Sequence, residues 1–204
     1  NQVNTAGTVY RLDTDGTNFS VLHRFQSYSS FNVNGNPINA DGSYPEAELV
    51  EGSDGHLYGV ARAGGPDGNG TVFKLSKDGT SFTVLHAFGA TTSAATATPV
   101  INADGVGPLA PLVQGADGYF YGTVSRGGVN GTGGFFRIGL DGTGFELLRT
   151  FPTLVAISTT PETNVDGAVP LAGLTDGQDG RLYGVTSAGG SNGVGTISAY
   201  APVG

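Results

Sequence analysis

The stretch GTVFKLSKDGTSFTVLHAF, residues 70–88, decides how this sequence is organised, because it occurs three times. An earlier copy reads GTVYRLDTDGTNFSVLHRF at residues 7–25, and a later copy reads GGFFRIGLDGTGFELLRTF at residues 133–151. The copies therefore start 63 residues apart, at positions 7, 70 and 133. A fixed period of this length indicates one supersecondary unit whose copies pack against one another. A side chain present in every copy is expected to build the unit, whereas a single active site must use residues found in one copy.

Each copy contains four candidate strands. Two alternating runs flank an Asp-Gly turn, and two more flank a second Asp-Gly turn after a variable loop. Asp-Gly between alternating runs is a strong hairpin signal, because both residues tolerate positive φ. No segment has helical apolar spacing over a useful length. The expected strands are residues 8–12, 19–25, 47–50 and 57–60, then 71–75, 82–88, 110–113 and 120–124, and finally 134–138, 145–151, 172–175 and 182–186.

The run at residues 82–88 predicts how the sheets pack. Strict alternation places positions 82, 84, 86 and 88 on one face and positions 83, 85 and 87 on the other, and both faces carry apolar groups. A sheet covered on both faces lies between neighbours. The prediction is an all-β repeat protein with β-propeller-like blades, and a β-trefoil is the alternative. We expect one repeat domain, 1–204, with units at about 7–69, 70–132 and 133–194 and an extra strand at 195–204.

The extra strand repeats the beginning of the unit, since GTISAY at residues 195–200 corresponds to GTVYRL at residues 7–12. An unpaired strand is a template for association. Three arrangements are open: the chain is a fragment of a longer array, the strand closes a ring beside the first unit, or it completes a sheet in another chain and gives a dimer or a filament. Three blades would make a very tight ring, which favours association or truncation.

The composition excludes several classes of partner. A formal net charge of −8 and a pI of about 4.6 argue against nucleic acid or an anionic membrane surface. No run of 18 apolar residues occurs, so membrane insertion is not expected. The chain has no Cys, which removes disulfides and thiolate metal sites. It also has no Met, so we expect that Asn1 follows a processing step or is the edge of a larger protein.

The middle copy resembles a family of bacterial secreted tandem-repeat proteins. Its LYG at 57–59, GG at 64–65, GTVFKL at 70–75 and VLHAF at 84–88 are similar to the motifs LYGTT-x-GG, GTVFKL and VLHxF of the "choice-of-anchor" proteins with GloVer repeats. The third copy departs from these motifs, with Phe135, Phe136 and Arg137 in place of VFK. The resemblance implies an extracellular or cell-surface protein, usually with more than three copies, and it implies no catalytic residues.

His23 and His86 occupy one position in two copies, and Arg149 takes that position in the third. These side chains could form a repeated ligand site, or a half-buried polar position that contacts the neighbouring unit. General-base chemistry needs one positioned His with an orienting partner, so the second interpretation is favoured. His56 has no counterpart and is expected to be exposed beside a turn.

Glu46, Glu48 and Glu51 occur in the first copy only and are the best candidates for catalysis. Glu46 and Glu48 would share one strand face, and two carboxyl groups about 5 to 10 Å apart can hydrolyse a glycosidic bond. A solvated acidic edge that discourages aggregation is the simpler interpretation.

Calcium is the one metal considered, and no other cofactor is expected. The Asn-x-Asp-Gly loops containing Asp41, Asp104 and Asp166 recur in every copy and are the calcium candidates. Asx-turns need the same residues, so a turn without metal is the simpler interpretation.

A glycan is the other possible ligand. Each first strand carries one basic residue, which could hold an anionic sugar or pair with a carboxylate, and each fourth strand carries one tyrosine. The basic residues are Arg11, Lys74 and Arg137, and the tyrosines are Tyr58, Tyr121 and Tyr183.

The function expected from the sequence is that of an exported structural or interaction module without catalytic activity, self-assembling through its terminal strand into oligomers or filaments. A carbohydrate-binding, lectin-like propeller is the alternative, and a polysaccharide-acting enzyme that uses Glu46 and Glu48 is the third. Specificity would reside in the variable loops at 26–38, 89–101 and 152–163, because loops vary on a fixed scaffold.

Overall fold

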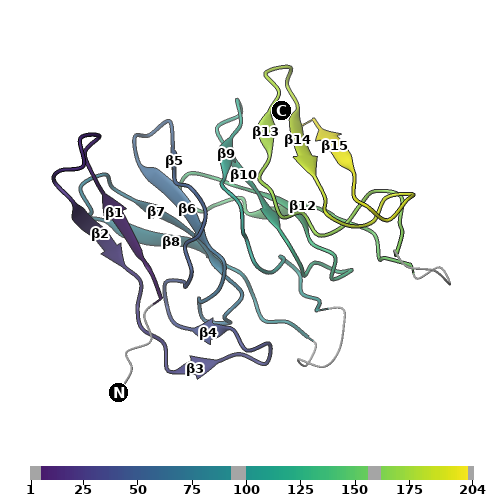
Figure 1. Cartoon of the computed structure of the whole chain (residues 1–204), viewed down its shortest axis with the longest axis horizontal. Helices are drawn as coiled ribbons and strands as arrows, with labels where there is room; N and C mark the ends of the chain where they lie inside the picture. The colour runs from purple at the N-terminus through teal and green to yellow at the C-terminus, as the bar shows by residue number, and fades with distance from the viewer. Residues whose placement is uncertain (1–5, 93–99, 156–161, 202–204) are drawn as a thin grey trace.

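The computed structural model describes residues 6–92, 100–155 and 162–201, and its regular elements are all β-strands. The all-β prediction is therefore confirmed. Within these ranges the strands form five antiparallel sheets of two to four strands, and none of the sheets closes into a barrel. Figure 1 shows the sheets following one another in chain order, so that the first and the last lie at opposite ends of the molecule. The described residues contain no helix that could cross a membrane.

Two sheets have four strands and share one topology, in which neighbours in sequence are neighbours in space. The first four-stranded sheet contains β5 (Val50–Glu51), β6 (Leu57–Ala61), β7 (Thr71–Leu75) and β8 (Phe82–Ala87). The second contains β9 (Val113–Gln114), β10 (Phe120–Val124), β11 (Gly134–Ile138) and β12 (Glu146–Thr150). The sequence placed β6, β7, β8, β10, β11 and β12 to within two residues at each end. It was less accurate for β5 and β9, which are shorter than expected and begin at the last residue of the expected strands 47–50 and 110–113.

Two smaller sheets precede these two along the chain, and one follows them. The N-terminal sheet pairs β1 (Thr8–Arg11) with β2 (Ser20–Arg24), and the C-terminal sheet contains β13 (Thr175–Asp176), β14 (Leu182–Val185) and β15 (Ile197–Tyr200). A short hairpin of β3 (Ser30–Phe31) and β4 (Pro37–Ile38) occupies the first variable loop and was not expected from the sequence. The other two variable loops lie partly outside the described residues.

Each four-stranded sheet combines strands from two consecutive sequence copies. β5 and β6 belong to unit 7–69, whereas β7 and β8 belong to unit 70–132. β15 accordingly pairs with β14 as β7 pairs with β6. The expectation of an unpaired extra strand was therefore wrong, because β15 is the third strand of its sheet. Its other edge has no partner strand in the described part of the chain.

The second strand of each copy contains a β-bulge. In the first four-stranded sheet the pairing passes from Val72–His86 directly to Phe73–Val84, so Leu85 is the extra residue. A bulge bends the strand and changes the face on which the following side chains lie. The same register shift occurs in the other two copies, at Leu22 and Leu148.

The bulge lets one strand contact two neighbouring sheets. Phe82, before the bulge, stacks on His23 of the preceding sheet, whereas His86, after the bulge, stacks on Phe145 of the following sheet. Phe88 also contacts the following sheet. The strict alternation expected for residues 82–88 was therefore wrong, although the conclusion that both faces are covered holds.

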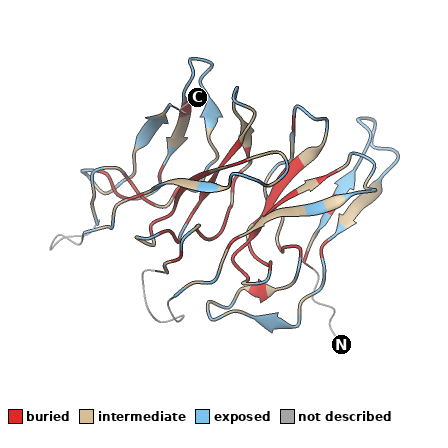
Figure 2. Cartoon of the chain, turned by 180° about the vertical axis from the view of Figure 1, so that it is seen from behind, coloured by how far each residue is buried: buried red, intermediate tan, exposed pale blue. Residues whose placement is uncertain are grey.

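The hydrophobic cores lie between consecutive sheets. One core joins the N-terminal sheet to the first four-stranded sheet, and a larger one joins the two four-stranded sheets. Figure 2 shows the buried segments in the middle of the molecule and exposed strands at both ends. The larger core contains the fully or nearly fully buried residues Tyr58, Val72, Phe88, Phe120, Phe136 and Ile138.

We expect Phe136→Ala to lower the free energy of unfolding by about 3 to 5 kcal/mol, because the substitution leaves a cavity in the larger core. Urea unfolding followed by fluorescence or circular dichroism measures this change. Phe31→Ala is the matched control, since Phe31 on β3 is 56% exposed and its loss should change the unfolding free energy by no more than about 0.5 kcal/mol. Equal effects of the two substitutions would contradict the core assignment.

Candidate functional site

The asparagine of each Asn-x-Asp-Gly loop fastens two loops together. The Asn39 side-chain oxygen accepts hydrogen bonds from the backbone N–H groups of Gly42 and Gly65, both at 3.0 Å, and its Nδ2 donates to the Gly42 carbonyl at 2.7 Å. The amide therefore satisfies backbone groups that the turn would otherwise leave unpaired. Asn102 and Asn164 make the equivalent bonds in the other copies.

The aspartates of these loops, which are the calcium candidates, contact the second strands. The Asp41 carboxylate lies 3.0 Å from Nε2 of His23 and accepts the Gln26 N–H at 3.0 Å. Asp104 lies 3.0 Å from Nε2 of His86. Asp166 pairs with Arg149. No group of three or more His, Cys, Asp or Glu side chains that could hold a metal occurs in the described ranges, and calcium binding at these loops stays a prediction.

The repeated histidines connect consecutive sheets. The His23 ring stacks on Phe82 with centroids 3.6 Å apart and an interplanar angle of 3°, and the His86 ring stacks on Phe145 at 3.6 Å and 6°. Each ring is thus held between a carboxylate and an aromatic face, which fixes its orientation. These contacts agree with the interpretation of the position as a polar contact to the neighbouring unit.

The three glutamates of the first copy are not arranged as a catalytic pair on a strand. β5 begins at Val50, so Glu46 and Glu48 lie in the irregular segment before it, and the expectation that they share a strand face was wrong. Glu46 is paired with Arg62 at 3.1 Å, while Glu48 is exposed. Glu51 is paired with Lys77 at 2.6 Å.

Asp54 is the centre of a polar cluster next to the larger core. Its carboxylate accepts hydrogen bonds from Nζ of Lys74 at 2.7 Å and from the hydroxyl of Tyr58 at 2.9 Å, and it lies 3.4 Å from Nδ1 of the partly exposed His56. Partial burial alone would raise the pKa of Asp54, but the bonds from Lys74 and Tyr58 outweigh it and lower the pKa from 3.8 to about 2. The hydrogen bond to Asp54 raises the pKa of Lys74, and burial raises the pKa of Tyr58.

The other tyrosines of this series repeat the bond to an aspartate. Tyr121 donates to Asp117 at 2.6 Å, and Tyr183 donates to Asp179 at 2.7 Å. Because the rings of Tyr58 and Tyr121 are fully buried, Tyr183 is the member of the series that a ligand can reach without opening the core.

The basic residues of the first strands differ from copy to copy. Lys74 binds Asp54, and Arg137 pairs with Glu146 at 2.8 Å. Arg11 is exposed and has no ion pair with any described residue. Position 199 in β15, which corresponds to these three, is alanine.

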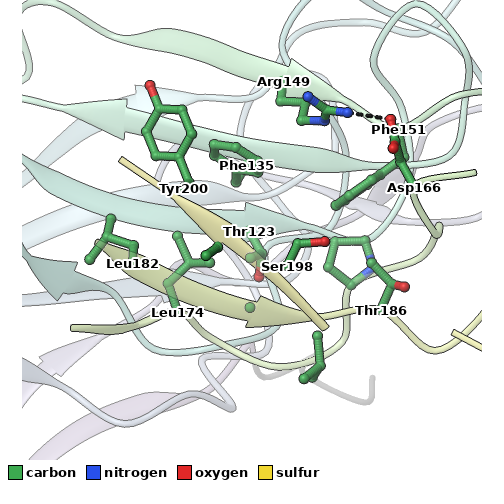
Figure 3. A pocket seen from close by; sticks show the side chains of 14 residues that line it. Thr123, Phe135, Arg149, Phe151, Asp166, Leu174, Leu182, Thr186, Ser198 and Tyr200 are labelled. Atoms are coloured by element: carbon green, nitrogen blue, oxygen red, sulfur yellow. Dashed lines mark hydrogen bonds and ion pairs between the residues drawn. The ribbon is translucent and has the colours of Figure 1, made fainter. Parts of the chain in front are cut away.

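A cavity of about 300 Å³ lies between the second four-stranded sheet and the C-terminal sheet, and we call it the terminal cavity. Figure 3 shows Arg149 and Asp166, joined by their ion pair, at one end of it and Tyr200 and Phe135 at the other. Tyr200 contacts Phe135 edge to face, with ring centroids 4.8 Å apart. The remaining lining includes Thr123, Phe151, Leu174, Leu182, Gly184 and Ser198.

The terminal cavity exists because the repeat pattern breaks in β15. In the four-stranded sheets a Cβ at Gly59 or Gly122 would lie 2.6 or 2.5 Å from the ring of the phenylalanine paired with it, Phe73 or Phe136. Gly184 is instead paired with Ser198, and among the described residues only Leu174 lies within 4 Å of a Cβ placed there. Sequence reasoning missed this site, although serine in the phenylalanine position of the repeat was the signal for it.

The position of His86 should tolerate arginine but not an apolar residue. His86→Arg keeps a basic partner for Asp104, as Arg149 does for Asp166. His86→Leu leaves the oxygen that contacted His86 with the Gly89 N–H alone, while the other oxygen keeps its bond from Asn102. We expect His86→Leu to lower the unfolding free energy by about 1 to 3 kcal/mol, and His86→Arg to lower it by clearly less. Urea unfolding compares the two variants. Equal losses would show that the Asp104 contact contributes nothing.

The lowered pKa of Asp54 makes part of the free energy of unfolding depend on pH. A carboxyl group whose pKa falls from 3.8 in the unfolded chain to about 2 in the folded protein stabilises the fold above about pH 4, and this contribution disappears as the pH falls towards 2. We expect Asp54→Asn to show a smaller loss of stability between pH 4 and pH 2 than the unchanged protein. Lys74→Met, which removes the main donor, should reduce the loss in the same way. Unfolding curves at several pH values test both, and parallel profiles for all three proteins would contradict the assignment.

Comparison with known proteins identifies the family but supplies no named relative. No curated protein matches the sequence. The family described as the Gloeobacter/Verrucomicrobia repeat matches residues 1–198, which confirms the resemblance seen in the repeat motifs. Because the match covers nearly the whole chain, this chain belongs to the Gloeobacter/Verrucomicrobia repeat family.

Proposed function

We propose that this chain is an exported structural module that associates with further β-repeat units through the edges of its terminal sheets. One observation carries the proposal: polar groups that recur along the chain bind other groups of the same chain, whereas strand edges and apolar side chains remain open at the two ends. Asn39, Asp41 and Asp54 are examples of such internally bound groups. Open strand edges pair readily with other strands.

The two ends differ in what they offer. At the N-terminal sheet, Tyr10 and Phe19 are 59% and 63% exposed. At the C-terminal sheet, Ile197 is 82% exposed and the terminal cavity lies next to the free edge of β15. Unlike ends favour head-to-tail association, which builds filaments unless a ring closes. Export to the cell surface rests on the family resemblance.

Glycan binding is the second candidate function, and the terminal cavity is the observation that favours it. The cavity combines the aromatic side chains of Phe135 and Tyr200 with the Arg149–Asp166 pair, and its volume suits a small ligand. Catalysis by Glu46 and Glu48 is not proposed, because Glu46 is already paired with Arg62 and both residues precede the strand.

Light scattering over a range of concentrations tests the proposed function. We expect the mass to rise with concentration in steps of the chain mass, 20.6 kDa, because each added copy leaves a new free end. A mass that stays at one chain throughout would contradict self-assembly. A glycan array run in parallel should remain blank, and a glycan whose binding is lost in Tyr200→Ala would establish the second candidate function instead.

A further inference from the structure

The N-terminal hairpin carries counterparts of the aromatic side chains that join consecutive sheets elsewhere in the chain. β1–β2 corresponds residue by residue to β7–β8, at a spacing of 63. Tyr10 stands in the position of Phe73, and Phe19 stands in the position of Phe82. Phe73 and Phe82 pack against Phe25 of the preceding sheet, whereas Tyr10 and Phe19 contact each other, with centroids 5.5 Å apart, and otherwise face outward.

The C-terminal sheet has the complementary gaps. β13 and β14 correspond to β5 and β6, which in the complete sheet are followed by β7 and β8. β15 takes the place of β7 but offers Ser198 and Ala199 where β7 offers Phe73 and Lys74. No counterpart of β8 lies beside it in the described residues, so no ring covers Arg149 as Phe82 covers His23.

The terminal cavity lacks two aromatic side chains, one at the position of Ser198 and one over Arg149. A ring at the position of Ser198 would lie next to Gly184 and Leu174, as Phe73 lies next to Gly59 and Leu49. A second ring would lie over Arg149 and beside Phe151, and arginine stacks on aromatic faces as imidazole does. Tyr10 and Phe19 sit on one hairpin with the spacing needed to supply both rings.

The opposite face of the hairpin offers a matching charge. In the first four-stranded sheet, Lys74 pairs across the strands with Tyr58 and binds Asp54. In the C-terminal sheet Tyr183 binds Asp179, but the residue paired with Tyr183 is Ala199, which supplies no cation. Arg11 is the exposed cation in the corresponding position of β1.

We propose that the β1–β2 hairpin of a second copy of this chain replaces β15 and completes the C-terminal sheet in the order β13–β14–β1–β2. Tyr10 and Phe19 of the second copy then fill the terminal cavity, and Arg11 binds Asp179. The backbone pairing of β14 with β15 is exchanged for an equivalent pairing with β1, so the gain comes from the side chains. Val185, which is 45% exposed although the equivalent Val60 is buried, also becomes covered.

A second copy is the occupant because the hairpin cannot reach the cavity of its own chain in this arrangement. Figure 1 shows β1–β2 and β13–β15 at opposite ends, with both four-stranded sheets between them. The hairpin is also held to its own chain by its other face, through Val9 and Phe25. Each copy can therefore donate a hairpin to one neighbour and accept one from another. This inference rests on the proposed self-assembly and names its contact.

Two variants and their mixture test this contact by sedimentation analysis. Phe19→Ser disables the hairpin but keeps the acceptor sheet, and Asp179→Arg disables the acceptor but keeps the hairpin. Each alone should associate at least tenfold more weakly than the unchanged chain, and the equimolar mixture should form a pair of one copy each and stop there. Phe31→Ser, which removes a similarly exposed ring on β3, should associate like the unchanged chain.

The outcomes separate this contact from the proposed function. A chain that never associates overturns both. A chain that associates, and does so equally well with Phe19→Ser, keeps self-assembly and overturns the hairpin contact. Arg11→Asp is a second hairpin variant in case Asp179→Arg disturbs folding. Because Arg11 is exposed, the Arg11→Asp variant should keep the circular dichroism spectrum of the unchanged chain while it associates more weakly. Unchanged association would overturn the ion pair between Arg11 and Asp179.

Discussion

The stacking of a phenylalanine ring on the imidazole of the preceding sheet joins the N-terminal sheet to the first four-stranded sheet and that sheet to the second. It occurs between His23 and Phe82 and again between His86 and Phe145, with nearly the same geometry. The bulge at Leu85 makes the series possible, because it turns Phe82 and His86 of one strand towards different neighbours. Without the extra residue, a strand with regular alternation would present both rings to the same side, and each sheet could join only one neighbour by this contact.

The recurring polar side chains serve the same end. Asn39 closes a turn, Asp41 orients His23, and Asp54 neutralises Lys74 beside the buried ring of Tyr58. A charged or amide group that satisfies buried backbone or a buried hydroxyl is costly to lose, and so it can recur without taking part in binding. Positions where one copy differs from the others, such as Ser198, are therefore better indicators of interactions with other molecules than positions that recur in every copy.

Much of the fold follows from the sequence, because the 63-residue period and the Asp-Gly turns locate nearly every long strand. The bulge does not, since apolar side chains occupy both faces of residues 82–88 and a change of face leaves no trace in the pattern. The burial of Tyr58 depends on Phe120 of the next sheet, 4.2 Å away between ring centroids, which local sequence cannot show. The terminal cavity could not be recognised from the sequence alone. The serine at position 198 is visible there, but only the strand register shows that it lies opposite Gly184.

The boundaries of the sequence copies do not coincide with the boundaries of the sheets, and this offset affects how the number of repeats can change in evolution. Since each four-stranded sheet is made from halves of two consecutive copies, recombination between tandem gene segments that inserts or deletes 63 codons adds or removes one whole sheet and keeps the strand order of the sheets on either side. The breakpoint can fall anywhere in the repeat, because the two hybrid halves always belong to the same pattern. The number of copies can therefore drift from one lineage to another without a new contact having to evolve.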